Sequence, residues 1–425
     1  MKNIKNTPVV LTVIIIILAV GVTGLLLYIK NQPAQVRGFP QLTEIKPMEP
    51  DSTIWGISFP NEYSSLIETK ENNTRTKYGG SEPLDKLAAD PNLVQLFAGF
   101  SFAKGYTEDR GHQNSLVDVR SSKRISEKTP GTCYSCKSTD NPKLWAAMGI
   151  AGYDAMKFSE LGIKINNPIG CTNCHEAGTM KLVVTNPALE NALLLQGKDW
   201  RNYSRQEMRS LVCANCHVTY YFEKEGNLLT LPWKYGTNID QIDKYYTENG
   251  FADWIHAKDG APMIKVRHPD YELFSAGSTH YNAGVSCADC HMPYERDGAV
   301  KFSDHNIKSP LLEPAESCGQ CHSNVEYVVQ RVETIQDQVH QTMINTENAL
   351  INAIDTIATA SNTINVDQAK LATARDQHRR AQLRWDFIAA ENGMGFHNPE
   401  EALRILAEST DMARQAQIIA IESMK

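Results

Sequence analysis

The chain has 425 residues and a formal net charge of −7 at pH 7, with 42% hydrophobic and 8% aromatic residues. This length is sufficient for one large domain or two to three ordinary ones, and the composition is that of a globular protein. The negative balance argues against a general nucleic-acid surface, so we expect no nucleic acid among its partners.

The N-terminus carries an uncharged apolar run over residues 9–29, preceded by two lysines. As a helix, this run is about 30 Å long, which matches the hydrocarbon core of a bilayer. No A-x-A-like cleavage site precedes residue 30, so we expect an uncleaved signal anchor, a transmembrane helix over residues 1–30. A cleaved signal peptide is the alternative. Both export the rest of the chain to the periplasmic or extracytoplasmic face, with residues 31–50 as a polar tether.

All ten cysteines fall in C-x-x-C pairs. The pairs are Cys133/Cys136, Cys171/Cys174, Cys213/Cys216, Cys287/Cys290 and Cys318/Cys321. Disulfides form in exported chains, but such short loops would constrain little. Zinc sites use C-x-x-C pairs without requiring a histidine directly after the second cysteine. Attachment of c-type haem does require one, because the thiols bond the vinyl groups and the histidine becomes the proximal iron ligand. The histidines that follow the second to fifth pairs are His175, His217, His291 and His322.

The first pair is followed by Lys137 instead of histidine. A lysine amine binds iron once it has lost its proton, and desolvation beside a metal favours that loss. The alternative is a surface lysine beside a pair that holds no haem, or a haem with another ligand. Of the 12 histidines, eight remain for distal iron positions and any catalytic role. Composition does not choose among them.

Several longer stretches resemble the pentahaem cytochrome c nitrite reductases, the ammonia-forming family. These stretches are RGHQNSLVDVRSSKR, CYSCK, CANCHVTYYF, HPDYELFSAG, CADCHMPY and RWDFIAAENGMGFHNPEEALRIL. The family has four C-x-x-C-H sites and one lysine site, which comes first, as it does here. The similarity covers the chain from about residue 50 to the C-terminus. It implies five covalently attached haem c groups, four of them carrying electrons to the one at Lys137.

The resemblance also implies roles for individual residues. The family's catalytic arginine matches Arg124, and Arg120 is the weaker candidate. Its catalytic tyrosine matches Tyr220 and not Tyr221. Its catalytic histidine matches His268. The distal iron ligands match His112 on the third haem, His305 on the second, His280 on the fifth and His397 on the fourth. We interpret His256, His340 and His378 as structural or exposed.

One departure from the family concerns calcium. Many members bind it beside the active site through a glutamate before the catalytic tyrosine and a glutamine before the catalytic histidine. Here these positions hold Thr219 and Arg267, whereas the nearby Lys265 is kept. Two oxygen ligands are lost and a fixed positive charge is gained. A calcium-independent subgroup has such an arginine, so we expect Arg267 to replace calcium; a surface arginine is the alternative.

We predict a mainly α fold, a multihaem cytochrome c with little β structure and long C-terminal helices. The pentahaem catalytic domain is assigned to residues 51–322, with much of its interior formed by porphyrin, and a helical region to 323–425. An amphipathic helix is predicted from Val325, because apolar residues recur every three or four positions. Another is predicted after Asn398, with Asn398 as N-cap and Pro399 at its first position. The C-terminal helices have more apolar faces than one monomer needs, and members of the family are homodimers, so we expect a homodimer. The alternative is that these faces pack on the haem domain of the same chain.

The resemblance thus implies an oxidoreductase that reduces nitrite to ammonium with six electrons at the Lys137 haem. Hydroxylamine or sulfite is a further or alternative substrate. The competing hypothesis is a non-catalytic multihaem electron-transfer cytochrome. We expect a membrane quinol-oxidising cytochrome as the electron donor and no bound calcium.

Overall fold

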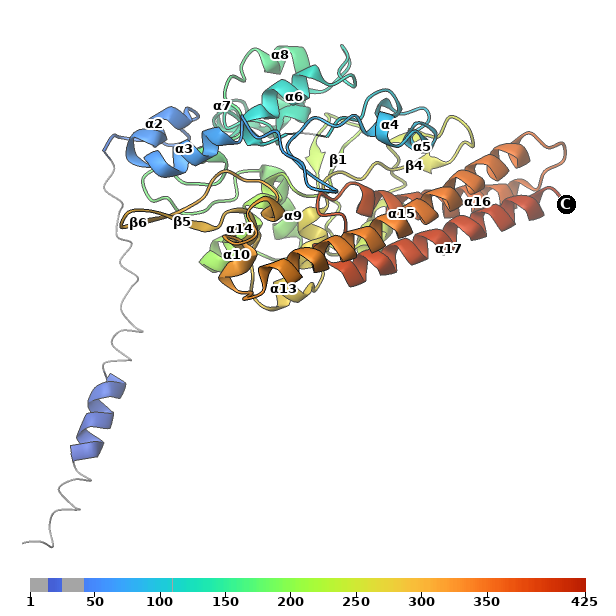
Figure 1. Cartoon of the computed structure of the whole chain (residues 1–425). Helices are drawn as coiled ribbons and strands as arrows, with labels where there is room; N and C mark the ends of the chain where they lie inside the picture. The colour runs from blue at the N-terminus through green and yellow to red at the C-terminus, as the bar shows by residue number, and fades with distance from the viewer. Residues whose placement is uncertain (1–13, 25–41, 109) are drawn as a thin grey trace, which may run out of the picture. The chain divides into compact units, whose positions relative to one another are not determined.

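The computed structural model describes residues 14–24, 42–108 and 110–425 (Figure 1). The chain divides into two compact units, Met1–Gln41 and Leu42–Lys425. In the first unit, residues 14–24 form a helix. The apolar run 9–29 extends beyond the described residues, so the transmembrane anchor stays a prediction. Across the described ranges, no helix is both long and apolar enough to cross a membrane.

The larger unit is mainly helical, as predicted, and its helices before residue 325 are short. These are α2 Ser52–Ser58, α3 Pro60–Glu68, α4 Lys86–Ala89, α5 Asn92–Leu96, α6 Ser115–Ser121, α7 Asn141–Asp154, α8 Phe158–Gly162, α9 Pro187–Leu195, α10 Arg205–Leu211, α11 Ile239–Glu248, α12 Asp270–Ser275, α13 Thr279–Asn282 and α14 Cys287–His291.

The strands of the described residues form three antiparallel pairs. They are β1 Tyr221–Phe222 with β2 Leu229–Thr230, β3 Trp254–Ile255 with β4 Pro262–Met263, and β5 Tyr294–Asp297 with β6 Val300–Ser303. The first two pairs flank two predicted catalytic residues. Tyr220 comes directly before β1, and His268 follows β4 in the same segment.

Local signals explain why the helices before residue 325 are short. Helix α9 begins with Pro187 at its first position, where a missing N–H costs nothing, and the side chain of Asn186 accepts a hydrogen bond from the N–H of Ala188. The chain leaves that helix through Gly197, whose φ of 70° is accessible to glycine at little cost. Such caps and turns lie between successive C-x-x-C motifs.

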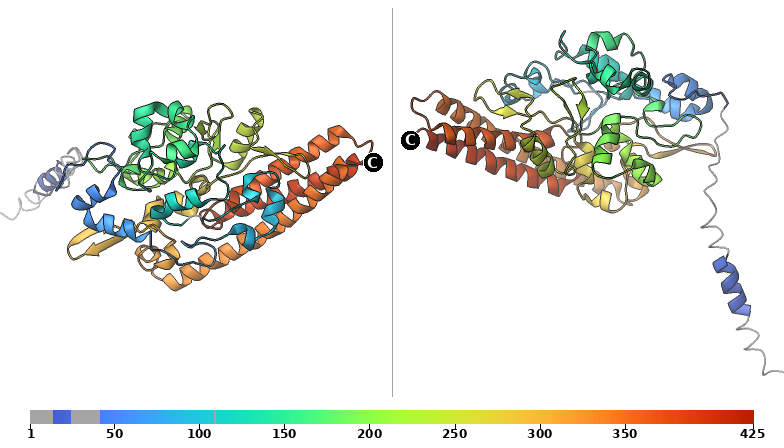
Figure 2. Two further views of the ribbon diagram at one scale, coloured as in Figure 1. Left: turned by 90° about the horizontal axis from the view of Figure 1, so that it is seen from above. Right: turned by 180° about the vertical axis from the view of Figure 1, so that it is seen from behind.

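Three long helices end the chain: α15 Val325–Ser361, α16 Gln368–Ala389 and α17 Pro399–Ser423. They lie side by side in Figures 1 and 2. The helix predicted from Val325 is confirmed, and so is the cap of α17, where the Asn398 side chain accepts from the N–H of Glu401. The largest apolar cluster joins these helices to α5, α11 and β4, with Leu350, Ile354, Trp385 and Ile405 among its buried members.

Candidate functional site

The C-x-x-C motifs fold into single tight turns. In the second, third and fifth motifs, the N–H of the following histidine donates to the carbonyl oxygen of the first cysteine. These N···O distances are 2.9 Å for His175, 2.8 Å for His217 and 2.9 Å for His322. The first motif differs, because the N–H of Lys137 donates instead to the carbonyl of Tyr134, at 2.9 Å. The lysine motif is therefore distinct in backbone as well as in side chain.

The ten cysteines are free thiols, and the motifs adjoin one another in pairs. The thiols of Cys136 and Cys216 lie close enough to act on each other's pKa, which brings the first motif to the third. The thiols of Cys213 and Cys287 do the same for the third and fourth motifs. The third motif therefore lies between the lysine motif and the fourth.

Cys321 departs from the other predicted haem-binding thiols in its exposure. It is exposed, whereas the other nine cysteines are half-buried. The cause is its place in the chain, because residues 319–324 are all exposed and lead directly into α15, so the protein covers this turn less than the others. The turn itself is formed, so haem attachment at Cys321 stays a prediction, now for a haem at the edge of the domain.

Three histidine pairs predicted to share an iron face each other at nearly one spacing. The ring centroids are 6.2 Å apart for His175 and His305, 6.2 Å for His291 and His397, and 6.3 Å for His280 and His322. A metal–imidazole bond is about 2 Å long, and the ring centre lies about 1 Å beyond the nitrogen. Two imidazoles on opposite sides of one iron therefore have centroids about 6 Å apart. The observed spacing fits such a site.

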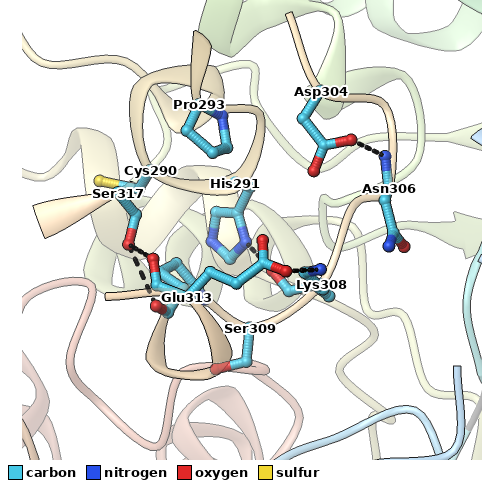
Figure 3. A pocket seen from close by; sticks show the side chains of 10 residues that line it. Cys290, His291, Pro293, Asp304, Asn306, Lys308, Ser309, Glu313 and Ser317 are labelled. Atoms are coloured by element: carbon cyan, nitrogen blue, oxygen red, sulfur yellow. Dashed lines mark hydrogen bonds and ion pairs between the residues drawn. The ribbon is translucent and has the colours of Figure 1, made fainter. Parts of the chain in front are cut away.

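The hydrogen bonds of these rings leave the correct nitrogen for iron. The Nδ1–H groups donate to backbone carbonyls: His175 to Met180 at 3.1 Å, His291 to Lys308 at 2.9 Å and His305 to Ser303 at 2.7 Å. A carbonyl oxygen only accepts, so Nδ1 carries the proton and Nε2 keeps its lone pair. Figure 3 shows His291 at the centre of a small cavity, with Lys308 beside it.

Three of the predicted ligand rings are also held neutral, as metal binding requires. Burial lowers the pKa of His112 to about 3, with further contributions from His217 and Lys137, so His112 lies close to both groups. Burial lowers the pKa of His175 and of His291 to about 4. The free thiols, opposed neutral imidazoles and available Nε2 atoms fit covalent haem.

Two arginines and a tyrosine gather at the lysine motif. The charges of Arg267, Arg124 and Lys137 all act on the Cys133 thiol, whose pKa burial raises to about 11. Those of Arg267 and Lys137 also act on Tyr220. Burial raises the pKa of Tyr220, which keeps its phenol protonated at neutral pH.

The two arginine candidates lie in different surroundings. Arg120 donates to the hydroxyl of Tyr134 at 3.3 Å and to the carbonyls of Gly162 and Ile165 at 3.1 and 2.7 Å. Its guanidinium thereby holds turns of the backbone together. Arg124 lies 4.3 Å above the Phe102 ring and donates to a single backbone carbonyl in the described contacts, that of Gly105 at 3.0 Å.

His268 is held in an unusual backbone conformation. Its φ is 41°, in the left-handed region that residues other than glycine seldom adopt. Strain of this kind costs about 1–3 kcal/mol and is concentrated at functional sites. The His268 ring centroid lies 6.3 Å from that of His217, at an interplanar angle of 67°. The structure thus places His268 beside the third motif, which itself adjoins the lysine motif.

Arg267 fills a site lined by oxygen atoms. Its Nη1 donates to the carbonyls of Tyr220 at 3.1 Å and Lys265 at 2.8 Å, and its Nη2 donates to Asp253 Oδ1 at 3.1 Å. Burial alone would lower the pKa of Arg267, but Asp253 and Tyr220 raise it above its usual value. A fixed cation therefore occupies a cluster of two carbonyls and a carboxylate. Sequence reasoning missed Asp253, which has no flanking motif.

A second buried ion pair holds the same segment. Lys265 Nζ lies 2.6 Å from Asp386 Oδ1 on α16, and both side chains are 1% exposed. Asp386 Oδ2 also accepts from the N–H of Val266 at 2.8 Å. The Lys265 ammonium lies 5.0 Å from the Phe102 ring, which Arg124 also contacts. Helix α16 thus fixes the segment that carries Arg267 and His268.

The remaining histidines have other partners. His256 and His378 are buried and share one carboxylate, Asp259, at Nδ1···O distances of 3.1 and 2.7 Å. His340 lies against Tyr78, with ring centroids 4.9 Å apart. None of these three is paired with a motif histidine among the described ring contacts, which agrees with a structural role.

The repeated thiol–histidine turns and the opposed imidazoles define a multihaem c-type cytochrome. A model of the cytochrome c552 family matches residues 51–424. The cytochrome c-552 of Parabacteroides distasonis is 40% identical over 394 residues, covering 88% of this chain and 77% of that protein. That of Bacteroides fragilis is 39% identical over 390 residues, with the same coverage.

A solved structure shares the fold as well. It is the catalytic subunit of the cytochrome c nitrite reductase of Desulfovibrio desulfuricans, described with two calcium sites. It is 34% identical, covers 90% of this chain and 88% of that one, and has a TM-score of 0.85. The chain belongs to the cytochrome c552 family, and the family resemblance read from the sequence is confirmed.

Proposed function

We propose that this protein reduces nitrite to ammonium at a haem held by Cys133 and Cys136 with Lys137 as iron ligand. The observation that carries the proposal is the gathering of Arg124, Tyr220 and Arg267 at the lysine motif. An electron carrier would not need two guanidinium groups and a protonated phenol beside one of its haems. The likeness to the Desulfovibrio nitrite reductase supports the same conclusion.

The cationic groups suit a small anion. Arg124 is held by stacking on Phe102, which leaves N–H groups of its guanidinium for nitrite oxygens. Arg267 is fixed by Asp253, so it contributes charge more than direct contact. Donors aimed at an oxygen that gains negative charge also favour N–O cleavage. The residues therefore bind the anion and help its oxygens to leave.

Protons come from His268 and Tyr220 in this proposal. The reaction consumes eight protons with six electrons, so donors must be reloaded repeatedly. Histidine exchanges protons near neutral pH, and a phenol with a raised pKa stays protonated to donate a hydrogen bond. Five haems, when bound, would supply the redox chemistry and electron relay, and the predicted distal histidines would make four of them six-coordinate.

Arg267 replaces an active-site calcium in our proposal. Its guanidinium hydrogen-bonds the carbonyl oxygens of Tyr220 and Lys265, which are the kind of ligands calcium prefers. Metal analysis of the purified enzyme tests this directly. We expect full activity without calcium; one calcium per chain, lost together with activity on chelation, would contradict the replacement.

The remaining assignments concern the surroundings of the enzyme. We infer an extracytoplasmic homodimer, held at the membrane by residues 1–30 and reduced by a quinol-oxidising cytochrome. N-terminal sequencing of the mature protein tests the anchor, since a retained Met1 supports it and a start after residue 30 contradicts it.

Reduced viologen as electron donor, with ammonium measured as product, tests the function. We expect nitrite-dependent viologen oxidation with ammonium formed in proportion. Hydroxylamine and sulfite are assayed in parallel to define the substrate range. A protein with the complete c-type haem spectrum that forms no ammonium would support the electron-transfer alternative and overturn the proposal.

A further inference from the structure

Asp270, the first residue of α12, contacts two of the predicted iron ligands. Its Oδ2 accepts from Nδ1–H of His217 at 3.1 Å, and its Oδ1 lies 3.8 Å from Nδ1 of His397. Asn392 completes the site, with its N–H donating to Oδ1 at 2.7 Å and its side-chain amide donating to Oδ2 at 2.9 Å. One buried carboxylate thus faces a ligand of the third haem and a ligand of the fourth.

The hydrogen bond of His217 differs from those of the other described ligands. His175, His291 and His305 donate from Nδ1 to backbone carbonyls, which carry no net charge. His217 donates to a carboxylate. A charged acceptor draws the Nδ1 proton more strongly and makes Nε2 a stronger donor to iron.

We propose that Asp270 is a positioning residue that lowers the reduction potential of the third haem strongly and that of the fourth weakly. It does so by fixing and polarising His217 and by placing a negative charge near His397. The inference depends on the haem assignment within the proposed function but not on the substrate.

The hydrogen bonds of Asp270 are those of an ionised carboxylate. Both of its oxygens accept, Oδ2 from His217 and from the Asn392 amide, and Oδ1 from the Asn392 N–H. A fixed negative charge favours ferric over ferrous iron, because the ferric centre carries one more positive charge. The effect is large at low dielectric and decreases with distance, so the third haem responds more than the fourth.

The position of the third motif explains why the reduction potential of its haem matters for electron transfer. Its Cys216 adjoins Cys136 of the lysine motif, and its Cys213 adjoins Cys287 of the fourth. The third haem is therefore the neighbour of the substrate-reducing haem. A low potential at this point makes it a strong reductant where electrons leave the relay.

The variant Asp270→Asn tests the proposal, because it keeps an oxygen acceptor and removes the charge. EPR-monitored potentiometric titration of the fully loaded protein separates the low-spin haems. We expect one haem to become at least tenfold easier to reduce, about 59 mV for a one-electron couple. A second haem should shift less in the same direction, and the others should not move.

Asp243→Asn is the matched control, because Asp243 is also buried but pairs with Arg379 and Arg384, and its described contacts include no iron ligand. Asn392→Ala should shift the reduction potential of the third haem in the opposite direction. Losing the amide donor leaves Oδ2 a stronger acceptor for His217, so the third haem should become harder to reduce.

Equal shifts in D270N and D243N would overturn the proposal, as would a rise in potential in N392A. If Asp270→Asn prevents haem loading, the sign of the N392A shift alone decides. A wild-type enzyme that forms no ammonium but shows these shifts would overturn only the nitrite assignment.

Discussion

The region predicted to bind haem, residues 51–322, differs from the C-terminal helices in what fills its interior. Helix α15 runs for 37 residues and buries Leu350 and Ile354 against its neighbours, whereas α7, the longest helix described before residue 325, has 14. In the haem region, histidine rings face each other at a spacing of 6.2–6.3 Å that leaves room for an iron atom between them. Side chains form the core of one region, and we expect haem to complete that of the other.

Preventing haem attachment should have the largest effect on the difference between the two regions. Protein expressed without cytochrome c maturation lacks the groups around which the short helices pack, so we expect residues 51–322 to lose native structure while α15–α17 stay largely helical. Limited proteolysis with mass spectrometry locates the cuts. Uniform resistance along the chain, equal to that of the holoprotein, would contradict the prediction.

The next largest effect is expected at the lysine motif. Arg124→Ala removes a donor for the anion, and we expect kcat/KM for nitrite to fall about 10²–10³-fold without loss of haem. Arg120→Lys is the comparison, because Arg120 holds backbone carbonyls. We expect it to lower the melting temperature more than the activity. If the two variants lose nitrite reduction equally, the choice of Arg124 is wrong.

A substitution in the side-chain core of the C-terminal helices should lower the stability of the protein and leave the haem potentials unchanged. Leu350 on α15 is 0% exposed. Replacing it by alanine removes buried methyl groups and leaves a cavity, which we expect to cost about 2–5 kcal/mol. Denaturant unfolding followed by circular dichroism measures the loss, with exposed Ile421→Ala as control. Haem potentials in L350A should match those of the wild type, since this core contains no iron ligand.

The smallest effect concerns a carboxylate between α15 and α5. Burial raises the pKa of Glu347 to about 7, while its side chain accepts from the amide of Asn92. The folded state therefore binds more protons than the unfolded state, whose glutamate pKa is about 4.3. Stability falls as pH rises through that interval. Glu347→Gln should remove this dependence of stability on pH. The melting temperature of the variant should therefore rise relative to that of the wild type as the pH increases from 5 to 8.

Much of this protein was predictable from local sequence. The C-x-x-C pairs with their following residues predicted the class of protein, because haem attachment depends on residues adjacent in the chain. The spacing of apolar residues from Val325 and the cap at Asn398 predicted α15 and α17 for the same reason. The mainly helical fold and the cytochrome family followed from these patterns.

Contacts between distant segments were decided by the tertiary structure. Nothing near Arg267 indicates that Asp253 and the carbonyl of Tyr220 will surround it, or that Asp386 on α16 will hold Lys265. The exposure of Cys321 is of the same kind, because its motif reads like the other C-x-x-C-H motifs and only packing leaves it uncovered.

Asp270 lies in a recognisable motif, yet its approach to His217 and His397 depends on how three separate segments pack. The sequence by itself predicted which residues bind haem. The fold decided which charges face them, because electrostatic partners are selected by distance in space and not by spacing along the chain.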